Sequence, residues 1–333
     1  MEEKVTEQGK KMNKISVSHL GPYVSGLLRR QIFSMFLILL LIWVVLSLLS
    51  PYFFTVNNLF EITLQSAVFA IIAAGETFVI FSGGIDLSVG SVFAFSSVVG
   101  GLVFQSTGSA FLSILTSILA GIFAGFINGA FITKLKVPPF VATLGMMGIA
   151  RGFALILCKG IPIYGLTKGY MWLGQGKIFG IIPVPTIIVA IIFILAFLVL
   201  KYTKFGRFTY AIGSNSEATR LSGIHIHRVT LGIYMVSGMM AAVAGVIESA
   251  RLATIQPAGG AGYELLAIGA VVIGGASLFG GEGEIIATLI GALIVTTIRN
   301  GLNILGIYAF WQYVVNGLII IIAVAIDQTR RRS

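Results

Sequence analysis

Long apolar stretches recur along this chain from Phe33 to Ile326, with no soluble-looking block between them. A helix that crosses a bilayer needs about 20 mostly apolar residues, and it satisfies its backbone hydrogen bonds internally. Of the 333 residues, 57% are hydrophobic and only 10% are charged, whereas a soluble domain carries about 25% charged residues. Such a chain cannot cover its apolar residues with a polar surface. The sequence therefore predicts an all-α integral membrane protein.

We expect about ten membrane-spanning helices, one for each apolar stretch that is long enough to cross. Their expected ranges are 33–49, 61–81, 86–105, 110–133, 140–158, 183–200, 229–250, 264–280, 284–304 and 309–326. An N-terminal segment, 1–32, precedes a single membrane domain over 33–326, and a basic tail over 327–333 follows it.

The basic residues predict that both ends of the chain lie on the cytoplasmic side. Sixteen of the 22 Lys and Arg residues fall in four segments that ten helices leave on one side of the membrane. These segments are 1–32, 134–139, 201–228 and 327–333. Cytoplasmic loops hold the excess of Lys and Arg in membrane proteins. The net charge of +10 is therefore explained by a chain embedded in a lipid bilayer, which we expect to be the cytoplasmic membrane, and we expect no nucleic-acid partner.

The stretch 75–91 places two acids in an apolar region, next to a pair of glycines. Ionisable residues within a membrane are costly and mark functional sites, and interrupted helices often line the binding sites of transporters. Candidates for a translocation pathway here are Glu76, Gly83, Gly84, Asp86 and Ser88. Asp86 has a second interpretation, as the N-cap of the following helix, which we favour and which is compatible with the first.

A second group of polar residues borders the connection between the seventh and eighth expected helices. Gln256, Tyr263 and Glu264 offer amide, aromatic and carboxylate groups of the kind that bind hydroxyls at a pathway entrance. Glu248 and Arg251 are three residues apart, and we expect them to form an ion pair on one helix face.

The polar segment 201–228 contains a pattern typical of a short capped helix over 214–220. Ser214 or Asn215 lies at the expected cap, and Glu217 falls in the first turn. A cytoplasmic helix of this kind could lie on the lipid headgroups or dock into a partner.

Glycine is frequent in the apolar stretches, where small residues let helices approach closely. Gly121, Gly125 and Gly129 share one helix face, and Gly148 and Gly152 share another. We favour packing within one subunit over a dimer contact for these residues.

A weak internal repeat is also present. The pattern G-G-x-x-L-x-x-G occurs at 83–90 and again at 274–281. Our topology places both copies at the cytoplasmic end of helices that run inward, which suits a parallel repeat.

Several chemistries lack their motifs in this sequence. It contains no G-x-x-x-x-G-K-[ST] phosphate-binding loop, so the chain does not hydrolyse ATP by that route. One cysteine and three histidines at unsuitable spacing indicate no metal site, and no catalytic constellation is present. We expect a transport subunit without enzymatic activity or bound cofactor. An ion-coupled secondary transporter, with Glu76 and Asp86 as coupling carboxylates, is the main alternative.

The chain resembles the ribose-permease family, the membrane subunits of ABC-type importers for pentoses, hexoses and related small sugars. The resemblance runs from about Pro51 to Asp327. Its most specific motifs are Ser82-Gly-Gly-Ile-Asp-Leu-Ser-Val-Gly-Ser91 and the segment 206–224, joined by 250–257, 262–265, 274–281 and 299–306.

The resemblance implies three protein partners: a cytoplasmic ABC ATPase that hydrolyses the ATP, an extracytoplasmic sugar-binding protein, and a second permease copy, identical or paralogous. It also implies that 206–224 is the segment that couples the permease to the ATPase. The candidate coupling residues are Gly206, Gly213, Asn215, Ala218, Arg220 and Gly223. Related permeases carry a furanone signal, polyols or nucleosides, so the substrate remains open among these compounds and the monosaccharides.

Overall fold

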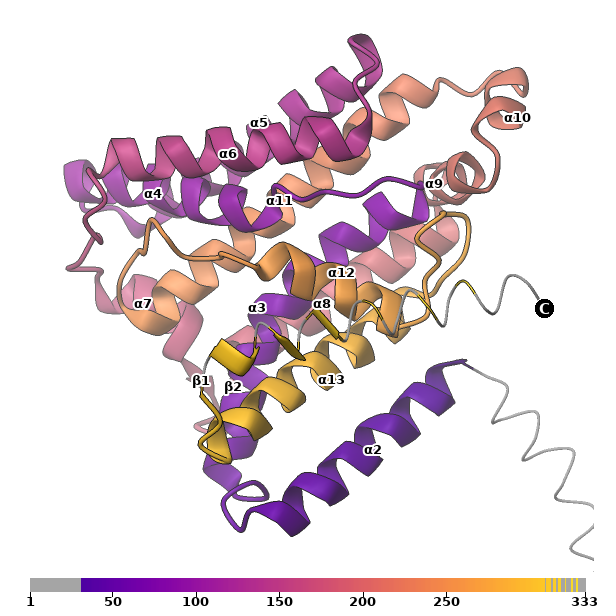
Figure 1. Cartoon of the computed structure of the whole chain (residues 1–333). Coiled ribbons are helices and arrows are strands. Elements are labelled where there is room, and N and C mark those ends of the chain that lie inside the picture. The colour runs from indigo at the N-terminus through magenta and orange to yellow at the C-terminus, as the bar shows by residue number, and fades with distance from the viewer. Residues whose placement is uncertain are drawn as a thin grey trace, which may run out of the picture.

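The computed structural model describes residues 31–308 and part of the stretch that follows, namely 310–312, 314, 315, 317, 318, 321, 325 and 328. Within this part the regular secondary structure is helical, apart from one small two-stranded hairpin (Figure 1). Residues 1–30, half of the expected tenth helix and nearly all of the basic tail lie outside the described residues. The predictions for those regions stay predictions.

Eight of the described helices are long and apolar enough to cross a membrane. They are α2 (Gln31–Leu49), α3 (Val56–Phe81), α4 (Val89–Thr107), α5 (Ala110–Lys134), α6 (Pro139–Leu157), α8 (Val184–Tyr202), α11 (Ile226–Leu252) and α13 (Ile285–Ile304). The predicted class, an all-α integral membrane protein, is confirmed.

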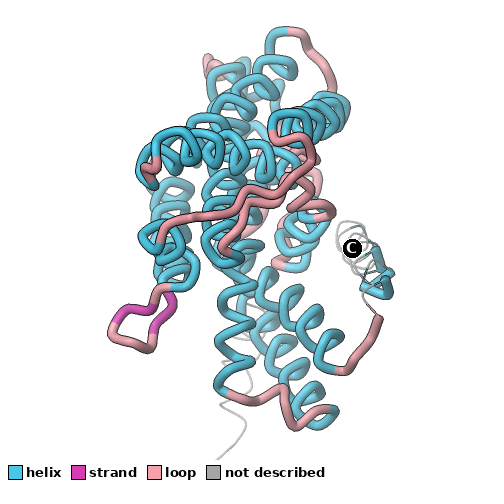
Figure 2. The backbone as a smooth tube through the Cα atoms, turned by 90° about the vertical axis from the view of Figure 1, so that its left-hand side faces the viewer, coloured by secondary structure: helices cyan, strands magenta, loops and turns pink. Residues whose placement is uncertain are grey.

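Shorter elements fill the polar connections between these helices. They are α7 (Lys168–Gln175), β1 (Lys177–Ile178), β2 (Ile182–Pro183), α9 (Lys204–Ser214), α10 (Ser216–Leu221) and α12 (Tyr263–Ile273). The smooth trace in Figure 2 shows the hairpin at the edge of the helical body. α9 and α10 occupy most of the polar segment 201–228.

The helix expected over 264–280 is shorter than predicted. α12 ends at Ile273, and Gly275 adopts a φ of 82°. A left-handed residue cannot continue a right-handed helix, and glycine adopts this conformation without a steric penalty. The 11 residues of α12 rise about 16 Å, roughly half of the hydrocarbon core. α12 is therefore too short to cross the membrane as a straight helix.

α3 is the central helix of the molecule. Every residue from Ser66 to Phe81 is buried, and the helix packs against α11, α13, α12 and α8. Figure 1 shows it running through the middle of the helical body. This burial contrasts with α2, whose apolar surface is mostly exposed in the structure. α3 therefore positions the residues that follow Phe81 within the fold.

Glycines bring α5 and α11 into backbone contact. A side chain at Gly121 would overlap the carbonyl of Gly238, and one at Gly125 would overlap the carbonyl of Tyr234. Gly129 approaches the same helix one turn further on. Small residues at such crossings allow close helix packing in membranes. For these three glycines, the predicted packing within one subunit is confirmed.

Gly148 and Gly152 of α6 do not show this packing. Beyond their own helix, no described atom lies within 4 Å of a side chain added at either residue. Gly125 and Gly148 therefore allow a matched comparison of how an added methyl group affects the stability of the protein.

We predict that Gly125→Ala lowers the melting temperature of the purified protein, because overpacking typically costs about 1–3 kcal/mol. Gly148→Ala has open space around it and should leave the melting temperature unchanged or raise it, since alanine favours helix more than glycine does. Thermal unfolding in detergent would test both variants. Equal melting temperatures would contradict the role of Gly125 in packing.

Candidate functional site

A seven-residue turn, 82–88, interrupts the helical path between α3 and α4. Gly83 adopts a φ of 78°, and the N–H of Gly84 donates to the carbonyl of Val79 at 3.0 Å, which closes the end of α3. The hydroxyl of Thr143 in α6 donates to the carbonyl of Ile85 at 3.2 Å. The predicted interruption is therefore present. Backbone groups of the turn find partners inside the protein, as buried backbone groups generally do.

Asp86 lies at the centre of a buried polar cluster on this turn. Its Oδ1 accepts hydrogen bonds from the N–H and the hydroxyl of Ser88 at 2.9 and 2.6 Å, and its Oδ2 accepts one from Ser237 of α11 at 2.8 Å. Its own N–H donates to Oε1 of Glu76 at 3.0 Å. Asn128 of α5 donates to the Ser88 hydroxyl at 2.8 Å. At most 1% of each residue is exposed.

The cluster joins the turn to three helices without an opposing cation. Among the residues that the structure describes, neither Glu76 nor Asp86 forms an ion pair. A buried carboxylate is costly unless hydrogen bonds compensate for the lost water, and Asp86 has three donors. The predicted N-cap role is wrong, because the N-cap of α4 is Ser88. Asp86 precedes the cap by two residues and binds it instead.

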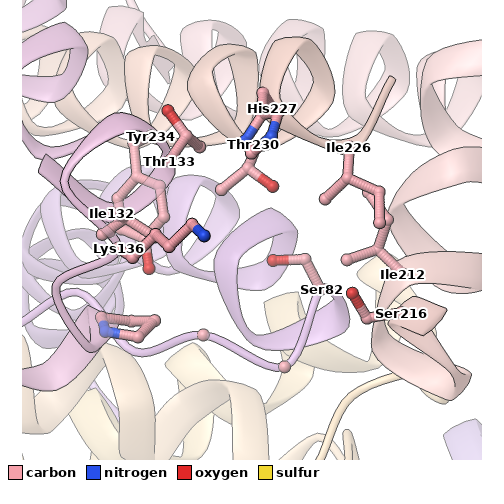
Figure 3. A pocket seen from close by; sticks show the side chains of 13 residues that line it. Ser82, Ile132, Thr133, Lys136, Ile212, Ser216, Ile226, His227, Thr230 and Tyr234 are labelled. Carbon is pink, nitrogen blue, oxygen red and sulfur yellow. The ribbon is translucent and has the colours of Figure 1, made fainter. Parts of the chain in front are cut away.

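A cavity of about 260 Å³ lies beside this turn (Figure 3). We call it the turn cavity. It is bounded by the turn, the α5–α6 connection, α9, α10 and the start of α11. Gly83 and Gly84 line it, and the pathway role predicted for them stays a prediction. Glu76, Asp86 and Ser88 do not, because they are enclosed in the cluster described above.

A smaller cavity of about 90 Å³ lies near the other end of α11. We call it the loop cavity. Gln256 and Tyr263 line it together with Glu248, whose Oε2 pairs with Nε of Arg251 at 2.9 Å. The expected ion pair is confirmed. Glu264 does not line the cavity, and its carboxylate accepts a hydrogen bond from the backbone two residues earlier.

Arg151 is a site residue that the sequence analysis did not single out. Its Nη1 donates to the carbonyls of Pro257 and Gly259 at 3.0 and 2.7 Å, and its Nη2 donates to the carbonyl of Gly90 at 3.4 Å. It thus ties α6 to the loop after α11 and to the start of α4. The rule that selected Glu76 and Asp86, an ionisable residue within an apolar helix, applies equally to Arg151.

α10 forms as predicted. The side chain of Asn215 accepts a hydrogen bond from the N–H of Ala218 at 2.9 Å, which makes Asn215 the cap. Glu217 and Arg220 form an exposed ion pair at 2.6 Å. The hydrogen bond from Arg220 lowers the pKa of Glu217 from its usual value. α10 protrudes at one end of the molecule in Figure 1.

The six predicted coupling residues divide into two groups. Gly206 is packed, because a side chain there would overlap the carbonyl of Leu200 in α8. Gly213 is packed as well. The exposed members of the group are Asn215, Ala218, Arg220 and Gly223.

Gly213 brings α9 into contact with the end of α3. A side chain at Gly213 would overlap the carbonyl of Phe81 and would lie 2.5 Å from the backbone nitrogen of Gly281. The N–H of Gly281 donates to the same Phe81 carbonyl at 2.9 Å. A side chain at Gly280 would lie 2.6 Å from the backbone nitrogen of Gly83. We call Gly83, Gly213, Gly280 and Gly281 the glycine node.

The node also brings together the two copies of the weak repeat, since Gly83 belongs to the first and Gly280 to the second. The turn, the coupling segment and the loop between α12 and α13 therefore meet by their backbones at a single place.

Fold and site together define a multi-pass membrane transporter, with a buried turn between two membrane-spanning helices and a cavity beside it. A family model described as "Branched-chain amino acid transport system / permease component" matches residues 58–324. The chain belongs to this family of transport permeases.

Individual relatives match most of this chain as well. Ribose import permease protein RbsC of Escherichia coli (strain K12) is 42% identical over 297 residues, which cover 88% of this chain and 92% of the relative. The protein of the same name from Bacillus subtilis (strain 168) is 44% identical over 298 residues, 89% and 92% of the two chains. D-allose transport system permease protein AlsC of Escherichia coli (strain K12) is 38% identical over 295 residues, 88% and 90%. No solved structure gave a significant match.

We predict that Asp86→Asn destabilises the protein by about 2 kcal/mol or more, because an amide cannot accept all three hydrogen bonds and each bond to a charged group contributes about 1.5–3 kcal/mol. Thermal unfolding in detergent would measure the loss. Glu217→Gln, which alters an exposed acid, is the control and should leave the melting temperature nearly unchanged. An unaltered melting temperature in Asp86→Asn would show that the cluster does not anchor the turn.

Proposed function

We propose that this chain is the transmembrane permease subunit of an ATP-binding-cassette importer that moves a monosaccharide, ribose or a similar pentose or hexose, into the cell. The observation that carries the proposal is the identity of 42–44% to ribose import permeases over almost the whole chain. Relatives at 38% and 35% identity are named for D-allose and L-arabinose. All of these relatives are named for monosaccharides, although the family model is named for branched-chain amino acids.

The energy would come from a separate cytoplasmic ATPase, since the chain itself lacks the phosphate-binding loop. α10 is the element suited to contact it. Ala218 and Arg220 are exposed, and Leu221 keeps 74% of its surface accessible. A short capped helix that presents an exposed leucine offers an apolar anchor to a groove in a partner.

Movement of α10 would reach the membrane core through the glycine node. α9 directly precedes α10 in the chain. It contacts the end of α3 through Gly213, and the turn 82–88 starts at that end of α3. We infer an alternating-access cycle in which ATP closes the ATPase pair, the coupling segments move, and two permease copies exchange an outward for an inward opening.

The loop cavity supports an entrance for the sugar on the side of the membrane opposite to α10. Tyr263 provides an aromatic face and Gln256 an amide, which suit the stacking and hydrogen bonding of a sugar. A cavity of about 90 Å³ is far smaller than typical ligand pockets, which start at about 300 Å³. An extracytoplasmic binding protein that delivers the sugar would then supply most of the specificity.

We predict that ribose uptake into liposomes containing this chain, its ATPase and its binding protein requires ATP and is insensitive to a protonophore. Uptake of radiolabelled ribose, with and without ATP on the ATPase side, would measure this. Uptake that persists without ATP and collapses with the protonophore would identify an ion-coupled transporter instead.

We predict that Ala218→Trp lowers co-purification of the ATPase and sugar-stimulated ATP hydrolysis about tenfold, a change of about 1.4 kcal/mol, because a bulky side chain disrupts docking of α10. Gly213→Val should retain the ATPase but lose stimulation, because the overlap falls on the glycine node. Ser106→Trp, an exposed change near the end of α4, is the control for binding of the ATPase. Normal stimulated turnover in both coupling variants would contradict the coupling role.

A further inference from the structure

The turn cavity has a chemical character that import of a neutral sugar does not require. Two basic side chains, Lys136 and His227, line it, and no aspartate or glutamate does. Five hydroxyl side chains line it as well: Ser82, Thr133, Ser216, Thr230 and Tyr234. A lysine ammonium group, an imidazole and surrounding hydroxyl donors are chemistry that binds phosphate.

Tyr234 provides an unpaired polar group at the wall of this cavity. Its side chain is 1% exposed, and its hydroxyl has no hydrogen-bond partner among the described residues. Figure 3 shows Tyr234 reaching the cavity from α11, on the same side as Lys136. A buried hydroxyl without a partner is unfavourable and uncommon in native proteins. Its position at the cavity wall provides a ready donor for a ligand.

Lys136 lines the cavity from a left-handed backbone position. Its φ is 54°, in the left-handed region that favours glycine, directly after the end of α5. Its amino group points into the cavity in Figure 3. Strained residues of this kind occur at functional sites when the surrounding structure maintains them.

The nearby acids do not neutralise this pair of basic groups. Glu217 follows Ser216 in sequence but is paired with Arg220 at 2.6 Å. Asp86 is enclosed by its three donors, and neither it nor Glu76 lines the cavity. The positive charge of Lys136 is therefore available to a ligand.

We propose that the turn cavity binds a small phosphorylated compound with free hydroxyl groups, with the phosphate at Lys136 and His227 and the hydroxyls at Tyr234 and Thr230. The volume of about 260 Å³ lies just below the range of about 300–1,000 Å³ for drug-sized ligands. A monosaccharide phosphate or a phospholipid headgroup has a suitable size, whereas a nucleoside triphosphate is too large. Both suitable ligands present the same phosphate and hydroxyl chemistry.

Binding there would link parts of the chain that move relative to one another. Ser82 belongs to the end of α3, Ser216 to α10 and Thr230 to α11, and all three line the cavity. A bound ligand would hold the coupling segment against the turn and slow transport. This regulatory consequence rests on the proposed function, whereas the binding site itself does not.

The test uses the full chain in nanodiscs of phosphatidylcholine, with ribose 5-phosphate as the probe and ribose as its neutral counterpart. Calorimetric titration should show at least tenfold tighter binding of ribose 5-phosphate than of ribose. Lys136→Ala should weaken that binding about tenfold or more, because it removes a charge-assisted hydrogen bond. Tyr234→Phe should weaken it by a smaller factor.

The matched controls are Lys134→Ala and His225→Ala, which alter exposed basic residues two positions before Lys136 and His227 that do not line the cavity. They should leave the affinity unchanged. Absence of ribose 5-phosphate binding, or equal losses in Lys136→Ala and Lys134→Ala, would overturn the proposed site.

Two further measurements identify the natural ligand and the consequence of binding. Nanodiscs that contain phosphatidylglycerol should weaken the apparent affinity for ribose 5-phosphate, in wild type but not in Lys136→Ala, if a lipid headgroup is the natural ligand. An unchanged affinity would assign the site to a soluble phosphate. With the ATPase present, ribose 5-phosphate should lower stimulated ATP hydrolysis in wild type only. Intact binding without this inhibition would overturn the regulatory role and leave the site in place.

Discussion

Three hydrogen bonds to the carboxylate of Asp86 hold the turn between α3 and α4 inside the protein. A turn that is buried within the protein has backbone and side-chain polar groups that water cannot reach, and each of them needs a partner. The turn meets this constraint with donors from Ser88 and Ser237 and with the acceptor Glu76. The positions of α4 and of both glycines that line the turn cavity depend on this arrangement.

The same turn begins at the glycine node. The buried cluster and the predicted coupling segment therefore contact the same short stretch of chain. Phe81 is the last residue of α3, and its carbonyl accepts the N–H of Gly281 at 2.9 Å. Gly213 packs on that carbonyl from α9. Only six positions separate Gly83 of the node from Val89, the first residue of α4. A displacement of α9 would therefore act on both α3 and the polar cluster.

Features set by local pattern were predictable from the sequence. The long apolar helices, the interruption at Gly83 and Gly84, the cap at Asn215 and the ion pair between Glu248 and Arg251 each depend on residues within a few positions of one another. The glycine node was not predictable, because Gly83 lies more than a hundred residues from Gly213, Gly280 and Gly281. Asp86 was misassigned because α4 begins two residues later than expected, with Ser88 as its cap, and its contact with Ser237 of a distant helix was not predictable. α12 ends early because the backbone turns at Gly275. Apolar residues continue beyond this position, so the apolar pattern does not indicate where the helix ends.

Contact through glycine has a mechanical consequence for a transporter. Side chains between two moving elements can change rotamer and absorb part of a displacement. Gly213 and Gly280 bring backbone directly against backbone, and protein interiors packed at this density compress little. Under the proposed function, a shift of α9 would therefore reach the end of α3 with little loss, because glycine leaves no side chain between the two backbones.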